Sequence, residues 1–259
     1  LDFNAIVLQE ASEESVPLIE RLRFLGIFSN NLDEFFQVRF ATVKRISQSD
    51  LTGKKALGGI VATELLEEIT GIVIDQQRQS LSILKDIEKK LSEENIIFLN
   101  EKEVSPHQEK FLNDFFNQHV GPALVTVILH DEIQDFSDNK AFLVITLNTL
   151  EKGKNKLLYA LIEIPKQLER FVVLPKEGDL QYVMLLDDLI RYNFHAIFNM
   201  FDCTSIEAHM VKITRDAELD LEEDVGKSYV EKIMNSVKDR MIGDPVRLVY
   251  DKGIPRKTL

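Results

Sequence analysis

The sequence predicts an α+β protein in which an amino-terminal helical domain precedes a mixed domain of strands and helices. Two observations support this prediction: apolar residues recur with helical spacing up to residue 91, and short apolar runs with strand character follow residue 104. Helices followed by strands, with few βαβ alternations, are typical of the α+β class. We place the boundary so that residues 1–103 form the helical domain and residues 104–259 form the second domain.

The helical domain is predicted to contain two long antiparallel helices and a short first helix. In the first long helix, apolar residues at steps of three, four or seven share one face: Leu18, Leu22, Leu25, Leu32 and Phe36. The second runs from about Leu57 to Leu91, with Val61, Leu65, Ile69, Ile72, Leu84 and Ile87 as its other apolar positions. A break is expected between them at Ser47-Gln48-Ser49-Asp50.

The second domain mixes helices with short strands. Ser105, Pro106 and Gln108 predict the start of a helix that runs to about Asn117. Strand-like runs follow at Val125–Leu129, Phe142–Leu147, Leu157–Ile164, Phe171–Leu174, Ile206–Met210 and Val246–Tyr250. The second and third of these are joined by a hairpin connection at residues 151–155. Helices are predicted at about Leu186–Met200 and Glu222–Met241.

Composition excludes several classes of protein. The net charge of −12 argues against a surface that binds nucleic acid or another polyanion throughout, so any phosphate site must be a local basic patch. No run approaches the ~20 apolar residues that cross a membrane. The first fifteen residues lack a basic segment, so no signal peptide is expected. The single cysteine, Cys203, favours a reduced, cytosolic setting. The chain starts at Leu1 and stops without a polar tail, so we expect a piece of a longer protein.

Neither a P-loop nor a metal site is predicted. Gly226-Lys227-Ser228 resembles the end of a P-loop, but Leu221 stands where the pattern needs glycine, and the triplet falls inside a predicted helix. No histidine has a second histidine or cysteine at metal-ligand spacing, and none is followed two positions later by lysine. The histidines are His107, His119, His130, His195 and His209. We interpret them as surface or structural side chains.

The most informative stretch is Ser29-Asn30-Asn31-Leu32-Asp33-Glu34. Asn31 followed three residues later by Glu34 indicates a helix junction, with Asn31 as cap and Glu34 completing a capping box. Two adjacent asparagines need only one cap, which leaves one amide for recognition. An amide offers both a donor and an acceptor, which suits an adenine edge. From the residues alone, the cap is the favoured interpretation.

Two other groups are candidates for binding or turn roles. The best local patch for an anion is the basic set Arg39, Lys44, Arg45, Lys54 and Lys55, although a solvated helix face is the favoured interpretation. The segment Thr214–Glu218 ends an alternating strand and is interpreted as an ordinary turn with Arg215 in a salt bridge. An exposed pair of that kind contributes only about 0–1 kcal/mol, so stability gives little reason for it.

Over essentially its whole length the sequence resembles the polyphosphate kinases of the histidine-phosphorylated type. The resemblance lies in Leu1–Ala11, Pro17–Phe35, Leu161–Pro165, Ile213–Glu218 and Asp244–Arg247. The stretch from Arg23 to Phe35 is the most specific of these. Residues 104–259 resemble the head domain of this family, which implies that they build much of the interface of a homodimer or higher homo-oligomer.

The resemblance implies an activity and one binding residue. The whole enzyme would transfer the terminal phosphate of ATP reversibly to inorganic polyphosphate, with Mg²⁺ and through a phosphohistidine. The family's adenine-binding asparagine falls on Asn31, which favours binding over the cap. The catalytic histidine, the Mg²⁺ ligands and most phosphate-binding arginines would lie outside these 259 residues. We therefore expect the chain alone to be inactive. A cytoplasmic location is implied, with peripheral membrane attachment left open.

A second hypothesis comes from a different class: a non-enzymatic interaction module that dimerises through its α+β domain. A dimer without any affinity for nucleotide would favour it. A nucleic-acid-associated protein is disfavoured by the net charge of −12 and by the lack of interleaved basic and aromatic residues.

Overall fold

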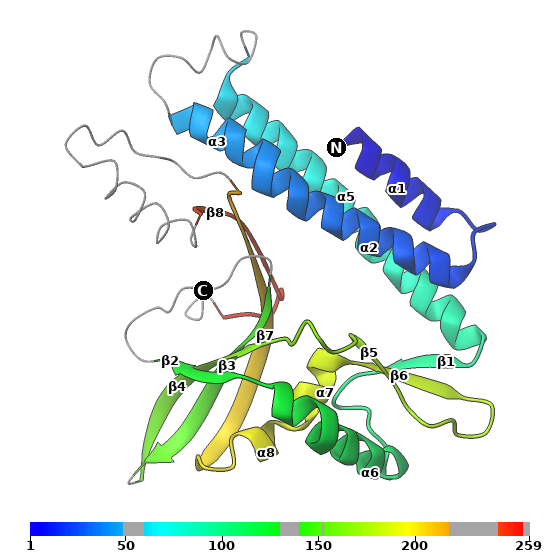
Figure 1. The fold of residues 1–259 in the computed structure, drawn as a ribbon, viewed down its shortest axis with the longest axis vertical. Helices are drawn as coiled ribbons and strands as arrows, with labels where there is room; N and C mark the ends of the chain where they lie inside the picture. The colour runs from blue at the N-terminus through cyan, green and yellow to red at the C-terminus, as the bar shows by residue number, and fades with distance from the viewer. Residues whose placement is uncertain (49–59, 130–139, 152, 218–242, 256–259) are drawn as a thin grey trace. The chain divides into compact units, whose positions relative to one another are not determined.

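The computed structural model describes residues 1–48, 60–129, 140–151, 153–217 and 243–255. These residues form two compact units, one with the described parts of 1–90 and 213–248, the other with those of 91–212 and 249–255. Helices come first along the chain and a mixture of strands and helices follows (Figure 1). The predicted α+β class is therefore confirmed.

The first unit contains four helices in its described residues: α1 (Asp2–Ser12), α2 (Leu18–Phe35), α3 (Ala41–Gln48) and α5 (Ala62–Glu93, of which the unit includes the part up to Lys90). A π-helical turn, η1 (Phe36–Phe40), joins α2 to α3. One uninterrupted helical path therefore runs from Leu18 to Gln48. The break predicted at Ser47-Gln48-Ser49-Asp50 is wrong for Ser47 and Gln48, which belong to α3. Ser49, Asp50 and Leu57, the predicted start of the second long helix, lie outside the described ranges.

The predicted apolar stripes form the core of these helices. Leu25 and Leu32 on α2 are buried, as are Ile69 and Ile87 on α5. Ile72 is an exception, because it is 39% exposed and its neighbour Val73 is buried instead. Helix α1 contributes Val7, Leu8 and Ala11 to the buried set.

A buried arginine ties the ends of three helices together. Arg21 is 2% exposed, and its Nε donates a hydrogen bond of 2.7 Å to the carbonyl of Ala11 at the end of α1. That carbonyl belongs to the last turn of a helix, where no intrahelical partner exists. The Nη2 of Arg21 lies 2.9 Å from Asp86 Oδ2 on α5, and Lys90 contacts the same carboxylate. Hydrogen bonds from Arg21 and Lys90 lower the pKa of Asp86.

Two β-sheets are present among the described residues. The larger has the order β2-β4-β3-β7-β8, and the smaller the order β1-β6-β5. The strands are β1 (Ile96–Leu99), β2 (Thr126–Leu129), β3 (Ala141–Glu151), β4 (Lys154–Glu163), β5 (Phe171–Val173), β6 (Gln181–Leu185), β7 (Cys203–Arg215) and β8 (Pro245–Tyr250). Six of them were predicted. Strands β1 and β6, which pair in parallel, were not predicted.

The predicted hairpin joins β3 to β4. Glu151 pairs with Lys154 at the end of an antiparallel register, so the connection is short. Gly153 has a φ of +76°, in the left-handed region that glycine enters without a steric penalty.

The helices of the second unit are α6 (Pro106–Phe115), α7 (Leu186–Tyr192) and α8 (Phe194–Ile197). The capping box at the start of α6 is present in part: the Ser105 N–H donates to Gln108 Oε1 at 3.0 Å. The single helix predicted from Leu186 to Met200 is wrong. The side chain of Asn193 donates to the carbonyl of Leu189 at 2.9 Å, which competes with regular helix continuation. The helix predicted at residues 222–241 and the Gly226-Lys227-Ser228 triplet lie outside the described residues.

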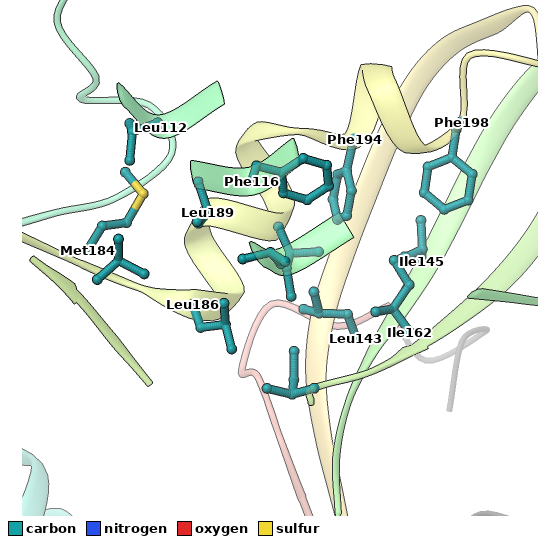
Figure 2. Packing of buried hydrophobic residues seen from close by; sticks show 14 of the residues in the cluster. Leu112, Phe116, Leu143, Ile145, Ile162, Met184, Leu186, Leu189, Phe194 and Phe198 are labelled. Atoms are coloured by element: carbon teal, nitrogen blue, oxygen red, sulfur yellow. The ribbon is translucent and has the colours of Figure 1, made fainter. Parts of the chain in front are cut away.

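One hydrophobic core lies between the larger sheet and its helices (Figure 2). Alternate residues of β3 belong to it: Leu143, Ile145 and Leu147 are fully buried. The other face of this strand is covered as well, because Phe142 and Val144 are also buried. Leu112 and Phe116 approach from the region of α6, and Leu186, Leu189, Phe194 and Phe198 from the region of α7 and α8. Each fully buried side chain of this size contributes about 1.5–3 kcal/mol to the stability of the fold.

Among the described residues, none of the helices has both the length and the apolar composition that crossing a membrane requires.

A network of charged side chains surrounds α7. Arg191 contacts three carboxylates: Asp187 at 3.0 Å, Asp188 at 2.7 Å and Asp251 at 3.5 Å. Arg170 contacts Asp187 from the segment before β5, at 2.6 Å. The pKa of Asp188 is raised to about 6, chiefly by burial and also by the charges of Asp187 and Glu101, while Arg191 opposes these effects.

The raised pKa of Asp188 predicts how unfolding depends on pH. Because the folded state holds the proton more tightly than the unfolded state, the charged carboxylate costs stability above pH 6, and this cost disappears as the pH falls toward 4. Asp188→Asn should therefore raise the free energy of unfolding at pH 7.5 by about 1–2 kcal/mol, after allowance for solvent screening and for the weakened contact with Arg191. The gain should shrink at pH 5. Urea unfolding at both pH values measures it.

The exposed residue Asp114 on α6 supplies the matched control, because Asp114→Asn removes the same charge without the burial. The raised pKa of Asp188 would be contradicted if Asp188→Asn increased the free energy of unfolding equally at the two pH values. It would also be contradicted if the increase equalled that of Asp114→Asn.

Candidate functional site

Asn31 lies inside helix α2 and is not a helix cap. The helix begins at Leu18 and continues past Asn31 to Phe35 and then into η1, so no helix starts at Asn31. Glu34 is exposed and completes no capping box there. The cap interpretation is therefore wrong. The physical reason is that the asparagine amide, which favours caps in isolation, is overridden by the buried apolar stripe of Leu25, Phe28 and Leu32.

The side chain of Asn31 has a donor without a partner. Its Nδ2 is buried and makes no hydrogen bond within the described residues, whereas the neighbouring Asn30 is exposed. A buried donor left unpaired costs about 1–3 kcal/mol, so a helix side chain in this state is unusual unless something else accepts its hydrogen bond. Ile27, one turn earlier and on the same side of the helix, is 44% exposed. Asn31 and Ile27 together therefore place an amide next to an apolar surface.

Arg247 on β8 contacts the same helix close to Asn31. Its Nη1 lies 3.1 Å from Asp33 Oδ1, and the two side chains are 12% and 11% exposed. The guanidinium also lies over the ring of Phe36, with 4.9 Å from its carbon to the ring centroid. Burial lowers the pKa of Arg247, and the charge of Asp33 opposes that shift. The contact joins the Pro17–Phe35 segment to the Asp244–Arg247 segment.

The end of β7 contacts the helical path just beyond. The N–H of Ala217 donates to the carbonyl of Gln37 at 3.0 Å, within the π-helical turn η1. Turns of this kind shift the helical hydrogen-bond register and occur often at functional sites. Arg45 forms an ion pair with Asp216, whose side chain is 7% exposed. Lys44 Nζ donates to the carbonyl of Pro245 at 3.0 Å.

These contacts change the interpretation of the basic set. Arg45 is mostly buried and paired and Lys44 is half-buried, so the helix carries neither an open anion patch nor a solvated face at these two residues. Arg39 is exposed, and Lys54 and Lys55 lie outside the described residues.

Thr214 and Arg215 of the predicted turn are buried, whereas Asp216 is half-buried and Ala217 is exposed. Thr214 is 0% exposed and Arg215 is 9% exposed, and Arg215 Nη1 donates to the carbonyl of Gly243 at 2.9 Å. The N–H of Asp216 donates to the carbonyl of Asp244 at 2.9 Å. Arg215 is therefore not in the exposed, weak kind of salt bridge that the sequence suggests. Glu218 lies outside the described residues.

The structure describes four of the five histidines. His107, His119 and His195 are exposed, His209 is half-buried on β7, and His130 lies outside the described residues. Within the described part of the chain, no group of three or more His, Cys, Asp or Glu side chains is placed to hold a metal ion.

Sequence reasoning selected Asn31 but missed the residues that hold its helix. Asp33, Phe36 and Arg247 were not candidates. One signal was available: Arg247 stands within the strand Pro-Val-Arg-Leu-Val-Tyr, where a charged residue needs a buried partner or a solvent-facing position.

Comparison with known proteins places the whole chain in one family. The family model described as the polyphosphate kinase N-terminal domain matches residues 1–99, and the one described as the polyphosphate kinase middle domain matches residues 107–259. The chain therefore belongs to the polyphosphate kinase family. The boundary that the sequence placed between residues 103 and 104 stays a prediction.

Several curated relatives carry the name polyphosphate kinase. The protein from Yersinia pestis is 36% identical over 262 residues, which cover 98% of this chain and 37% of the relative. The protein from Escherichia coli K12 is 35% identical over 263 residues, with 98% and 37% covered. The crystal structure of polyphosphate kinase from Porphyromonas gingivalis matches 98% of this chain and 34% of that chain, with a TM-score of 0.76 and 26% identity. The chain thus spans 37% of the length of these curated relatives.

The close approach of β7 and β8 generates a stability prediction for Gly243. A Cβ at Gly243 would overlap the carbonyl oxygen of Asp216, so the backbone would have to move. Gly243→Ala should lower the free energy of unfolding by about 1–3 kcal/mol, as overpacking does elsewhere. Gly71→Ala in α5 is the control, because no described atom beyond the nearby backbone of its own helix lies within 4 Å of its Cβ position. It should stabilise by about 0.5–1 kcal/mol.

Urea unfolding of the two variants compares them directly. Equal stability of Gly243→Ala and the wild type would show that the two strands separate readily at this point.

Proposed function

We propose that this chain supplies the adenine-binding side of the ATP site of a polyphosphate kinase, with Asn31 as the residue that hydrogen bonds to the base. The observation that carries the proposal is the buried Nδ2 of Asn31, which has no partner among the described residues. Family membership supports a kinase, and the position of Asn31 in the Pro17–Phe35 segment supports its role.

The chemistry of the asparagine amide fits adenine. Nδ2 can donate to a ring nitrogen of the base, while Oδ1 can accept from the exocyclic amine, as asparagine does with adenine elsewhere. A ring nitrogen would also satisfy the donor that the protein leaves unpaired. The exposed surface of Ile27 would support one part of the flat ring by apolar contact.

The whole enzyme would transfer the terminal phosphate of ATP reversibly to inorganic polyphosphate through a phosphohistidine. A nucleophilic histidine would divide one difficult transfer into two easier steps. When bound, Mg²⁺ would neutralise charge on the phosphate oxygens. We assign no Mg²⁺ ligand and no catalytic residue to this chain. Its share of the reaction is to hold the base, which fixes where the triphosphate lies. A homodimer built largely by residues 104–259 is part of the proposal.

Calorimetric titration of ATP into the complete gene product tests the role of Asn31. Asn31→Ala should raise the Kd for ATP about tenfold, which corresponds to about 1.4 kcal/mol. Its melting temperature should be unchanged or higher, because the variant removes a buried unpaired donor. The adjacent exposed residue gives the matched control: Asn30→Ala should bind ATP like the wild type.

An unchanged Kd in Asn31→Ala would remove Asn31 from the site. A wild-type protein that dimerises without any affinity for ATP would favour the interaction-module hypothesis instead.

A protein of residues 1–259 alone is predicted to transfer no phosphate from ATP to polyphosphate. Radiolabelled ATP incubated with the purified chain and polyphosphate measures this directly. Phosphate transfer by the chain would contradict the assignment of all catalytic groups to residues beyond it.

A further inference from the structure

We infer that the ion pair between Asp33 and Arg247 is a positioning device, which fixes the rotation of helix α2 about its axis so that Asn31 faces the nucleotide. The inference rests on the proposed function. It adds two positioning residues, Asp33 and Arg247, that act through Asn31 and not by contact with ATP.

The spacing along the helix places the pair opposite Asn31. Successive residues of an α-helix are about 100° apart, so Asn31 and Asp33 differ by about 200° and point to opposite sides. Leu32 lies between them and is 1% exposed in the core of the unit. Rotation of the helix would therefore move Asp33 and Asn31 in opposite directions, and a contact that holds Asp33 also holds Asn31.

Arg247 holds the helix at two points almost one turn apart. Its Nη1 is 3.1 Å from Asp33 Oδ1, and its guanidinium lies over the ring of Phe36, three residues further on. The planar guanidinium suits both contacts, because it can hydrogen bond in its plane and stack on its face. Both charged side chains are nearly buried, so water competes little with the pair.

Two further contacts hold the part of the helical path that follows α2. The carbonyl of Gln37 accepts from Ala217, and Arg45 pairs with Asp216. These contacts lie beyond the Asp33 turn along the helical path. Among these contacts, the Asp33–Arg247 pair is nearest to Asn31 in sequence. It therefore has the largest effect on the orientation of Asn31.

Steady-state kinetics of the complete gene product test the inference with two variants. Asp33→Asn keeps the shape and removes the charge, whereas Arg247→Lys keeps the charge and removes the planar group. Both should raise the KM and the calorimetric Kd for ATP by about three- to tenfold, with kcat at saturating ATP within about twofold of the wild type.

The matched control breaks the ion pair between Arg21, near the start of α2, and Asp86 on α5. Asp86→Asn removes the partner of Arg21, ten residues before Asn31 on α2. It should lower the melting temperature while leaving the KM for ATP unchanged. Hydrogen exchange adds a readout that needs no nucleotide: amides of residues 29–35 should exchange faster in Arg247→Lys than in Asp86→Asn.

The outcomes separate this inference from the proposed function. If Asn31→Ala weakens ATP binding while both Asp33→Asn and Arg247→Lys bind normally, the positioning role is wrong and the proposed function stands. If Asp86→Asn raises the KM equally, the effect is general destabilisation and the inference fails. If Asn31→Ala binds ATP normally, the proposed function fails and the inference falls with it. Should Asp33→Asn not fold, Arg247→Lys decides.

Discussion

The buried ion pair between Asp33 and Arg247 is the constraint on which the proposed site depends. It joins residues 214 positions apart in sequence, and it links the amino-terminal helical path to strand β8 within one compact unit. Removal of one partner from such a pair costs about 3–5 kcal/mol, because the other charge stays buried and uncompensated. A helix that leads without interruption from Leu18 to Gln48 can therefore hold the partly buried Asn31 in one orientation.

The second unit also contains an arginine that pairs with carboxylates from segments distant in sequence. Arg191 pairs with Asp187 and Asp188 on α7 and with Asp251 after β8, and Asp251 Oδ2 also accepts from the N–H of Met210 at 2.7 Å. Buried charges add little net stability when they are well paired, but they penalise every arrangement in which they are unpaired. In both units they join segments that are distant in sequence, while the apolar core supplies most of the favourable free energy.

Residue patterns could predict much of this fold. The stripe of Leu25 and Leu32, the strand-like run Phe142–Leu147 and the hairpin connection at residues 151–155 are local signals, and each is confirmed. The cap at Asn31 and the single helix from Leu186 to Met200 are wrong, because tertiary contacts override local preference at Asn31 and a side-chain hydrogen bond ends the helix at Asn193. The partners of Arg247 could not be predicted. Nothing local to β8 indicates which distant carboxylate or ring fills the space beside its guanidinium.

The most direct test of the account is a structure of the complete gene product with a non-hydrolysable ATP analogue. If Asn31 holds the base, its Nδ2 lies within hydrogen-bond distance, about 2.7–3.2 Å, of a ring nitrogen of the adenine, and the Asp33–Arg247 pair is intact. A base bound elsewhere, with Asn31 Nδ2 still unpaired, would contradict it.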